Sequence, residues 1–259
     1  MCRLAAYLGP PLLLKQFLFD PSHSLVKQSW APREMDEAVL NADGFGFGWY
    51  TGQQQPATYL NTHPIWSDSN LTGLASTLTS GIWLACVRSA TPGQMTGLVN
   101  TQPFSNGSLL FMHNGFIKNF NPEYRVKFHN ILKAEIQAGI NGHTDSEYIF
   151  ALFRQEILLN PDTDPVTRLG RCLAQIPEII DGGTALLNII ICDGSRIYVT
   201  RHAVNGHSPS LYYAVNAGLF SDAVVVASER MTEDSCWQVV PDHSLVVVSG
   251  SAKPEIIAL

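Results

Sequence analysis

The pattern of apolar and polar positions divides the first two thirds of the chain into predicted strands and helices. Short apolar and aromatic runs bounded by turn residues are typical of strands. They occur at residues 4–9, 44–50, 57–61, 81–89 and 108–115. Serine or aspartate ahead of regularly spaced apolar residues is typical of a helix start. We expect helices over residues 67–80, 122–139, 145–159 and 164–179.

The C-terminal third consists of short runs in which Val, Ile and Leu follow one another almost without interruption. These runs predict strands at residues 184–193, 196–203, 210–215, 222–229 and 244–250. Continuous apolar strands are covered on both faces, so the pattern predicts two buried sheets with helices outside them. No repeat or Ser/Gly linker interrupts the chain, and residues 51–57 are interpreted as a loop between two strands.

Composition narrows the class of protein. The 259 residues are 46% hydrophobic and 15% charged, which argues against disorder. The net charge is −6 and no basic stripe is present, so nucleic acid is not expected as a partner. No apolar run is long enough to span a bilayer, and the N-terminus lacks the features of a signal peptide. We therefore expect a cytoplasmic protein without a membrane partner.

The five cysteines are widely spaced along the chain. No CxxC pair or HExxH spacing is present, so we expect neither a metal site nor structural disulfides. Cys2 differs from the other cysteines because it directly follows the initiator methionine. Removal of Met1 would leave a thiol and a free α-amine on one residue, and the amine, with a pKa of about 7.7–8.0, could activate the thiol as a nucleophile. Alternatively, Cys2 is a buried apolar residue that opens a strand.

Two further stretches carry candidate chemistry. Arg88 ends an apolar strand, where it could hold a carboxylate through a bidentate pair or lie on the surface. Asn114 and Gly115 form the strongest short signal for a hairpin turn. They could instead form an oxyanion hole, to which the Asn114 amide and the Gly115 N–H would both donate. The neighbouring His113 is interpreted as a strand-end residue without a catalytic role.

Two more stretches allow a structural and a functional interpretation. Thr144 and Glu147 fit a capping box at the start of a helix, and Asp145 beside them could hold an ammonium group. The alternating glycines of residues 40–50 permit a close approach to the backbone, by a ligand or by another segment of the chain. Trp30 and Trp49 are interpreted as core residues, or as walls for a cationic ligand.

Together, these residues would supply a nucleophile, a carboxylate clamp, an oxyanion hole and an ammonium clamp. That set suits the α-amino-acid end of a γ-glutamyl amide. The same stretches resemble the class II glutamine amidotransferases, and among them most of all the ergothioneine-biosynthesis amidohydrolases. The resemblance runs through residues 1–11, 20–34, 41–50, 87–93, 113–115 and 142–150, and more weakly through 225–234.

The resemblance implies an α+β fold: a four-layer αββα sandwich of two antiparallel sheets flanked by helices, as in N-terminal-nucleophile hydrolases. It implies one domain over residues 1–259, removal of Met1, and the Cys2 amine as general base. Asn114 and Gly115 would form the oxyanion hole. The glutamyl carboxylate and amine would be held by Arg88, Thr91 and Asp145. No cofactor is implied.

The resemblance also implies a substrate, γ-glutamyl-hercynylcysteine sulfoxide, cleaved to hercynylcysteine sulfoxide and glutamate. Because no synthase domain is recognisable in the sequence, a stand-alone hydrolase of a small molecule is the simplest expectation. The alternatives are a glutaminase or glutathione-degrading subunit that works with a separate partner, and a non-catalytic binding protein. The sequence leaves open whether the chain forms a homo-oligomer.

Overall fold

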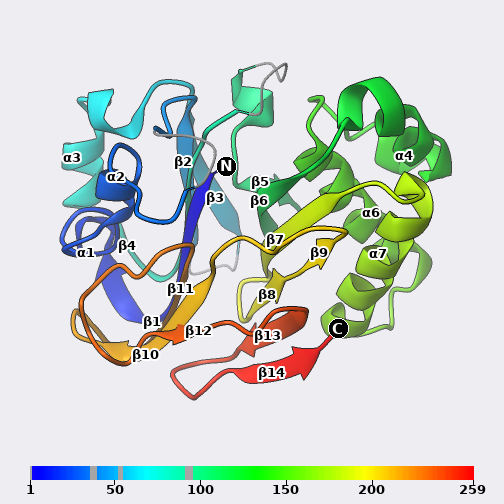
Figure 1. Cartoon of the computed structure of the whole chain (residues 1–259). Coiled ribbons are helices and arrows are strands. Elements are labelled where there is room, and N and C mark those ends of the chain that lie inside the picture. The colour runs from blue at the N-terminus through cyan, green and yellow to red at the C-terminus, as the bar shows by residue number, and fades with distance from the viewer. Residues whose placement is uncertain (1, 36–39, 52–54, 91–95) are drawn as a thin grey trace.

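Two antiparallel sheets packed face to face form the centre of the molecule, and a layer of helices covers the outer face of each (Figure 1). The computed structural model describes residues 2–35, 40–51, 55–90 and 96–259. The four layers confirm the predicted αββα sandwich and its α+β class.

The first sheet has the N-terminal strand β1 (Arg3–Leu13) at its centre, between β11 and β4. Alternate residues of β1 face opposite sides: Leu4 and Ala6 enter the core between the sheets, whereas Ala5 and Tyr7 enter the core under the outer helices. The strand order is β12 (Gln238–Val239), β10 (Tyr212–Ala217), β11 (Phe220–Ala227), β1, β4 (Thr79–Val87), β2 (Phe45–Tyr50) and β3 (Pro56–Asn61).

The second sheet is built around β7 (Ala185–Cys192), which is buried along its whole length. Its order is β14 (Glu255–Ala258), β13 (Ser244–Val248), β8 (Ile197–Arg201), β7, β6 (Leu109–Ile117) and β5 (Phe104–Asn106), with β9 (Ala203–Val204) also paired to β7. Strand β6 places Phe111 toward the helices and Met112 toward the first sheet.

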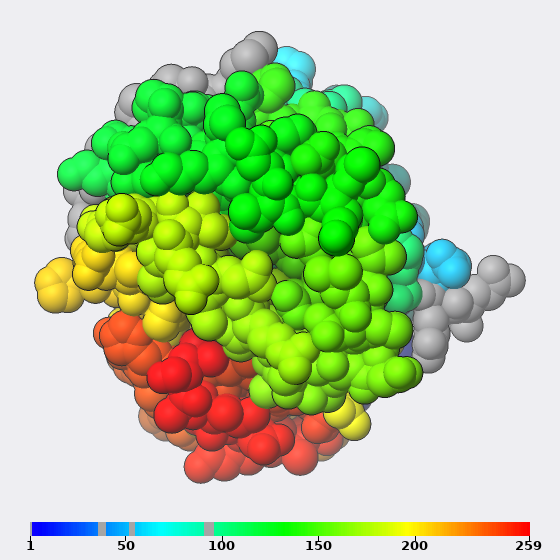
Figure 2. Space-filling model, turned by 90° about the vertical axis from the view of Figure 1, so that its right-hand side faces the viewer, coloured from blue at the N-terminus to red at the C-terminus, as the bar shows by residue number. Residues whose placement is uncertain are grey.

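The helices divide between the two outer faces. The first sheet is covered by α1 (Leu14–Leu18), α2 (Leu25–Gln28), α3 (Leu71–Ala75) and the short turn η1 (Ile65–Ser67). The second is covered by η3 (Phe120–Tyr124), α4 (Arg125–Ile131), α5 (Ala134–Gln137), α6 (Asp145–Leu159) and α7 (Pro165–Ile180). Figure 2 views this second face, where the green and yellow-green helical residues lie above the red C-terminal strands.

The last two helices illustrate how the sequence pattern sets packing. In α7 the buried residues recur at helical spacing, at Leu169, Cys172, Leu173, Ile176 and Ile180, which is typical of a helix with one apolar face. Helix α6 is buried on nearly every side because it packs against β6, α4, α5 and α7. It is therefore the interior helix of this layer.

Several predicted boundaries were wrong. The helix expected over 67–80 is only α3, because Thr79 and Ser80 already pair with β1. The helix expected over 122–139 is interrupted at Leu132, whose backbone is extended. The short elements α1, α2 and β14 were not predicted, since four or five residues carry too little periodicity to identify.

The alternating glycines of β2 are explained by contact between the sheets. A Cβ on Gly46 would lie 2.3 Å from the Gln102 carbonyl oxygen, and one on Gly48 would lie 2.8 Å from Leu110 Cδ1. A side chain at Gly48 would therefore push β6 of the second sheet away, and one at Gly46 would displace the segment that leads into β5. Of the two alternatives for this segment, the structure favours close approach of another chain segment.

Candidate active site

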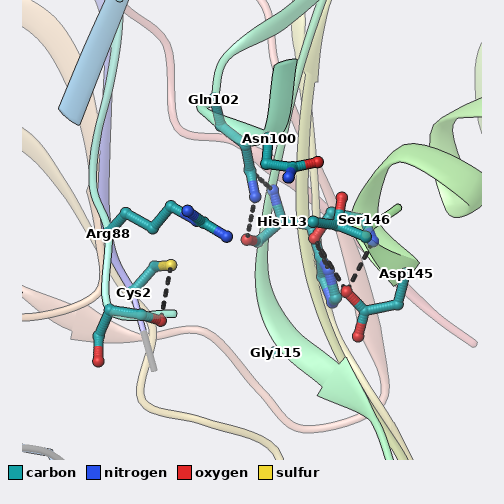
Figure 3. Close-up of a pocket in the computed structure, with 10 residues that line it drawn as sticks. Cys2, Arg88, Asn100, Gln102, His113, Gly115, Asp145 and Ser146 are labelled. Carbon is teal, nitrogen blue, oxygen red and sulfur yellow. Dashed lines mark hydrogen bonds between the residues drawn. The ribbon is translucent and has the colours of Figure 1, made fainter. Parts of the chain in front are cut away.

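A small pocket opens where β1 begins, β4 ends and α6 begins (Figure 3). It brings together four of the candidate catalytic and binding residues, namely Cys2, Arg88, Gly115 and Asp145. The remaining lining residues are Ser89, Asn100, Gln102, His113, Thr144 and Ser146. Residues from distant parts of the chain therefore meet at one end of the sandwich.

Cys2 immediately precedes β1 and packs partly against the core between the sheets. Its Sγ lies 3.9 Å from the Ser89 carbonyl oxygen. The pKa of the Cys2 thiol is lowered to about 6. A hydrogen bond from the Cys86 thiol is the largest cause and acts against burial, and the Arg88 charge acts in the same direction as Cys86. The same contact, together with burial, raises the pKa of Cys86. Cys2 is thus the thiol of this pair that ionises first.

Arg88 follows β4 and is almost completely buried. Its backbone is fixed by the Asp43–Gly44 turn: the Arg88 N–H donates to the Gly44 carbonyl at 2.8 Å, and the Asp43 N–H donates to the Arg88 carbonyl at 3.0 Å. Gly44 has a φ of +111°, and a Cβ there would lie 2.8 Å from the Asn61 carbonyl oxygen. A glycine is therefore required at this turn. Figure 3 shows the Arg88 guanidinium extending from the Cys2 side toward Gln102.

Asp145 is the first residue of α6 and is 3% exposed. Its Oδ2 accepts the Ile117 N–H at 2.7 Å and its Oδ1 accepts the Ser146 N–H at 2.8 Å. These bonds join the helix start to the end of β6. Within the described part of the chain, no lysine, arginine or histidine forms a salt bridge with this carboxylate.

The predicted capping box at this helix is formed only in part. The Thr144 hydroxyl accepts the Glu147 N–H at 3.3 Å, as an N-cap does. Glu147, however, accepts from the N–H groups of Asn141 at 2.6 Å and Gly142 at 2.7 Å. It therefore holds the loop before the cap, and this loop approaches Asn100, whose Oδ1 lies 3.2 Å from the His143 nitrogen.

Asn114 and Gly115 lie inside β6, so the alternative of a hairpin turn at these residues was wrong. Gly115 lines the pocket, and a Cβ there would lie only 1.8 Å from the Leu186 carbonyl oxygen. The Asn114 side chain is fully buried beside the pocket and does not line it. Its Nδ2 lies 3.4 Å from the Ser228 hydroxyl oxygen. Its Oδ1 has no hydrogen-bond partner among the described residues.

His113 also lines the pocket, and both of its ring nitrogens are engaged. Nε2 lies 2.8 Å from the Leu186 carbonyl oxygen and Nδ1 lies 2.9 Å from the Ser146 hydroxyl. Because a carbonyl only accepts, Nε2 carries the proton and Nδ1 accepts from Ser146. Burial lowers the pKa of His113, although the nearby Asp145 opposes this. A neutral histidine that joins β6 to its neighbours accounts for these contacts.

Other expected residues lie elsewhere. Thr91 and Met1 fall outside the described residues. Trp49 packs against Trp83, with ring centroids 6.0 Å apart, under the outer helices of the first sheet. Trp30 is 50% exposed, so its interpretation as a core residue was wrong. Neither tryptophan lines the pocket.

Sequence reasoning missed two residues, Gln102 and Arg3, that hold the backbone of pocket residues in place by hydrogen bonds. Gln102 accepts the His113 N–H at 2.6 Å and donates to the His113 carbonyl at 3.2 Å. Arg3 donates from Nε to the Cys2 carbonyl at 2.8 Å and from Nη1 to Glu229 at 3.1 Å. Only the position of Arg3 beside Cys2 could have drawn attention to it, because the other contacts join residues far apart in sequence.

In the described ranges, no three His, Cys, Asp or Glu side chains are grouped so as to hold a metal ion. None of the helices described is long and apolar enough to cross a membrane. All five cysteines are free thiols.

Comparison with known proteins relates the chain to one family. The profile of the class II glutamine amidotransferases matches residues 16–215. A gamma-glutamyl-hercynylcysteine sulfoxide hydrolase of Mycolicibacterium smegmatis is 31% identical over 248 residues, covering 96% of each chain. A Saccharomyces cerevisiae protein named probable glutamine amidotransferase DUG3 is 31% identical over 294 residues, covering 96% of this chain and 82% of its own. A glutamine aminotransferase class-II domain protein of Silicibacter pomeroyi has a solved structure with a TM-score of 0.74, 26% identity and 99% coverage of both chains.

Proposed function

Because this chain belongs to the class II glutamine amidotransferases, enzymes of the N-terminal-nucleophile hydrolase type, we propose that it hydrolyses a γ-glutamyl amide through Cys2. One observation carries the proposal. Cys2, Arg88, Gly115 and Asp145 come from four separate segments, and all four line the same small pocket.

The charges in this pocket match the two charged groups on the glutamyl α-carbon, the carboxylate and the ammonium group. The Arg88 guanidinium is a donor for the α-carboxylate, since its planar fork matches two carboxylate oxygens. The Asp145 carboxylate forms no salt bridge within the described chain and is the acceptor for the α-ammonium group. Thr91 is a further carboxylate contact by its place in the family motif. A substrate held at both groups would present its side-chain amide to Cys2.

The reaction begins once Met1 has been removed. The Cys2 α-amine takes the thiol proton, and the sulfur attacks the γ-carbonyl carbon to form a tetrahedral intermediate. Asn114 Nδ2 and the Gly115 N–H donate to its oxyanion. The C–N bond then breaks, and the leaving amine takes a proton from the Cys2 ammonium group. Water adds to the thioester in the same way, the carbon–sulfur bond breaks, and glutamate and the free thiol are released.

The proposed substrate is γ-glutamyl-hercynylcysteine sulfoxide, cleaved to hercynylcysteine sulfoxide and glutamate. Its support is similarity to hydrolases named for that compound, which extends over 96% of this chain. The α-carbon clamp described above acts on the glutamyl part alone, so it is equally suited to other γ-glutamyl amides.

A second candidate is the hydrolysis of glutamine or glutathione as a subunit beside a separate partner. The observation that favours it is the equal identity, 31%, to the probable glutamine amidotransferase DUG3. The non-catalytic alternative has no support, because family membership identifies the chain as an enzyme.

The test is glutamate release by the protein without Met1, measured with glutamine, glutathione and γ-glutamyl-hercynylcysteine sulfoxide. A preference of kcat/KM for the sulfoxide supports the proposal, whereas a preference for either of the others supports the second candidate. Cys2→Ala serves as the negative control, and protein that keeps Met1 as another, since its Cys2 nitrogen is an amide and cannot act as the base. Release of glutamate by the Cys2→Ala variant would contradict the mechanism.

A further inference from the structure

The nucleophile residue is attached to a buried pair of opposite charges on the other side of its own peptide group. Arg3 is fully buried, and its Nε donates to the Cys2 carbonyl oxygen at 2.8 Å. Its Nη1 lies 3.1 Å from Oε1 of Glu229, which is 1% exposed. The guanidinium therefore connects the main chain of Cys2 to a fixed carboxylate two residues after the end of β11.

Glu229 is itself held by donors from the segment that contains α2. His23 Nε2 lies 2.6 Å from Oε2, and the N–H groups of Arg33 and Glu34 donate to the two carboxylate oxygens at 2.9 and 3.1 Å. Burial works to raise the pKa of Glu229, and these hydrogen bonds together with Arg3 hold it below its usual value. The carboxylate is thus a rigid, charged anchor for Arg3.

This arrangement is poorly explained by stability alone. Moving two charges out of water is costly, and well-packed apolar residues often replace a buried ion pair without loss of stability. The Nη2 group of Arg3 is buried and has no hydrogen-bond partner among the described residues, which adds to that cost. The ion pair instead fixes the position of one atom of the nucleophile residue, the Cys2 carbonyl oxygen.

We propose that Arg3 and Glu229 are positioning residues for the reaction, which fix the Cys2 peptide plane so that its thiol and its α-amine face the scissile amide together. The proposal rests on the proposed function of Cys2. The N-terminal residue of a chain has no preceding peptide bond to orient it. In the absence of that peptide bond, the hydrogen bond from Arg3 Nε to the Cys2 carbonyl oxygen fixes the orientation of the residue.

Arg3→Lys separates positioning from charge pairing. A lysine ammonium can still pair with Glu229, but it lacks the rigid fork that donates to two acceptors at once. We expect kcat to fall by about tenfold to a hundredfold with KM within about threefold of wild type, because small displacements of reacting groups act on the chemical step. We expect the variant to melt within about 4 °C of wild type. An unchanged kcat in Arg3→Lys would overturn the proposal.

Glu229→Gln and Glu233→Gln form a matched pair. Glu233 also forms a 3.1 Å ion pair with an arginine, Arg33, but that pair is exposed, with 54% and 71% of the two side chains accessible. We expect Glu229→Gln to lower kcat in the same way as Arg3→Lys and Glu233→Gln to leave it unchanged. Equal losses in the two variants would assign the effect to general structure, and the proposal would fail.

Alkylation of Cys2 by iodoacetamide provides a readout that needs no substrate. The rate would be followed by intact-protein mass and N-terminal fragmentation, which also confirm that Met1 is absent. A thiol that moves away from the Cys86 donor and the Arg88 charge is less ionised, so Arg3→Lys should react at least about threefold more slowly at neutral pH. This holds even if wild-type protein releases glutamate from no γ-glutamyl compound, which would reject the proposed function only. Equal alkylation rates would reject the positioning role.

Discussion

The Ser228 hydroxyl group contacts the Asn114 amide and also binds the backbone of β1, the strand that directly follows Cys2. Asn114 Nδ2 lies 3.4 Å from Ser228 Oγ, and the same oxygen accepts the Leu4 N–H at 2.9 Å. A half-turn of the Asn114 amide would let the Ser228 hydroxyl donate to Oδ1 and would free Nδ2. That nitrogen could then serve the oxyanion proposed above.

Ser228→Ala should therefore impair catalysis more than binding. Loss of the hydroxyl removes the group that orients Asn114, and removing an oxyanion donor outright costs about 10²–10³ in rate. We expect kcat to fall by about tenfold to a hundredfold with little change in KM, and Ser228→Thr to restore most of it. Steady-state glutamate release would measure both constants.

Ser80→Ala is the control for this variant. Ser80 is a buried serine in β4 of the first sheet, and its hydroxyl likewise accepts a backbone N–H, from Ile82 at 3.1 Å. Each alanine variant leaves one buried N–H without its acceptor, at a cost of about 1–3 kcal/mol of stability. If Ser80→Ala lost as much kcat as Ser228→Ala, the effect would be one of folding and the orienting role of Ser228 would be wrong.

The thiol pair at the pocket predicts a pH dependence. Because the pKa of Cys2 is lowered to about 6, with the Cys86 hydrogen bond as the largest cause, Cys2 should be largely thiolate at neutral pH, and its alkylation rate should rise with pH through about 6. Cys86→Ala removes the donor, so the midpoint should move to higher pH. Cys86→Ser keeps a hydroxyl donor and should stay near wild type. The measurement is the pH profile of iodoacetamide labelling at Cys2, and equal midpoints in the two variants would contradict the assignment.

The proposed contact of Asp145 with the substrate ammonium group can be tested with a pair of substrates. Glutamine has the α-amine, and glutaramate is the same molecule without it. Asp145→Asn should lower kcat/KM for glutamine by about tenfold to a hundredfold, the size expected for a charge-assisted hydrogen bond. It should change kcat/KM for glutaramate far less, because that substrate makes no such contact.

Asp164→Asn is the matched control for this test. Asp164 is the N-cap of α7 and accepts the Thr167 N–H at 3.0 Å, and asparagine is an equally good N-cap. Activity on both substrates should be unchanged. A parallel loss on glutamine and glutaramate in Asp145→Asn would show that Asp145 acts through the 2.7 Å bond from Ile117 to its Oδ2 and not through the substrate.

The layers of the fold could be predicted from the sequence because strands and helices have local sequence patterns. Continuous apolar runs identified strands such as β7, and a capped periodic segment identified α6. The contacts of Arg3 with Glu229 and of Asn114 with Ser228 had no such signal, since each joins residues more than 100 positions apart. The hairpin-turn alternative at Asn114–Gly115 was wrong because pairing with β7 overrides a local preference. That residues 1–259 form one domain stays a prediction.

Gly115 provides a stability prediction that is independent of the reaction. An added Cβ would lie 1.8 Å from the backbone oxygen of Leu186, which cannot move without distorting β7. Gly115→Ala should therefore lower the free energy of unfolding by about 3 kcal/mol or more, at the upper end of overpacking effects. Chemical denaturation would measure the change.

Gly170→Ala provides the opposite case within the same chain. Gly170 lies inside α7, and a Cβ there would meet nothing within 4 Å. Replacing a glycine in a helix interior by alanine stabilises by about 0.5–1 kcal/mol, because alanine loses less backbone entropy on folding. The two glycine variants should therefore shift the unfolding midpoint in opposite directions. A Gly115→Ala protein as stable as wild type would mean that β6 and β7 are not in the close register that places Gly115 opposite Leu187.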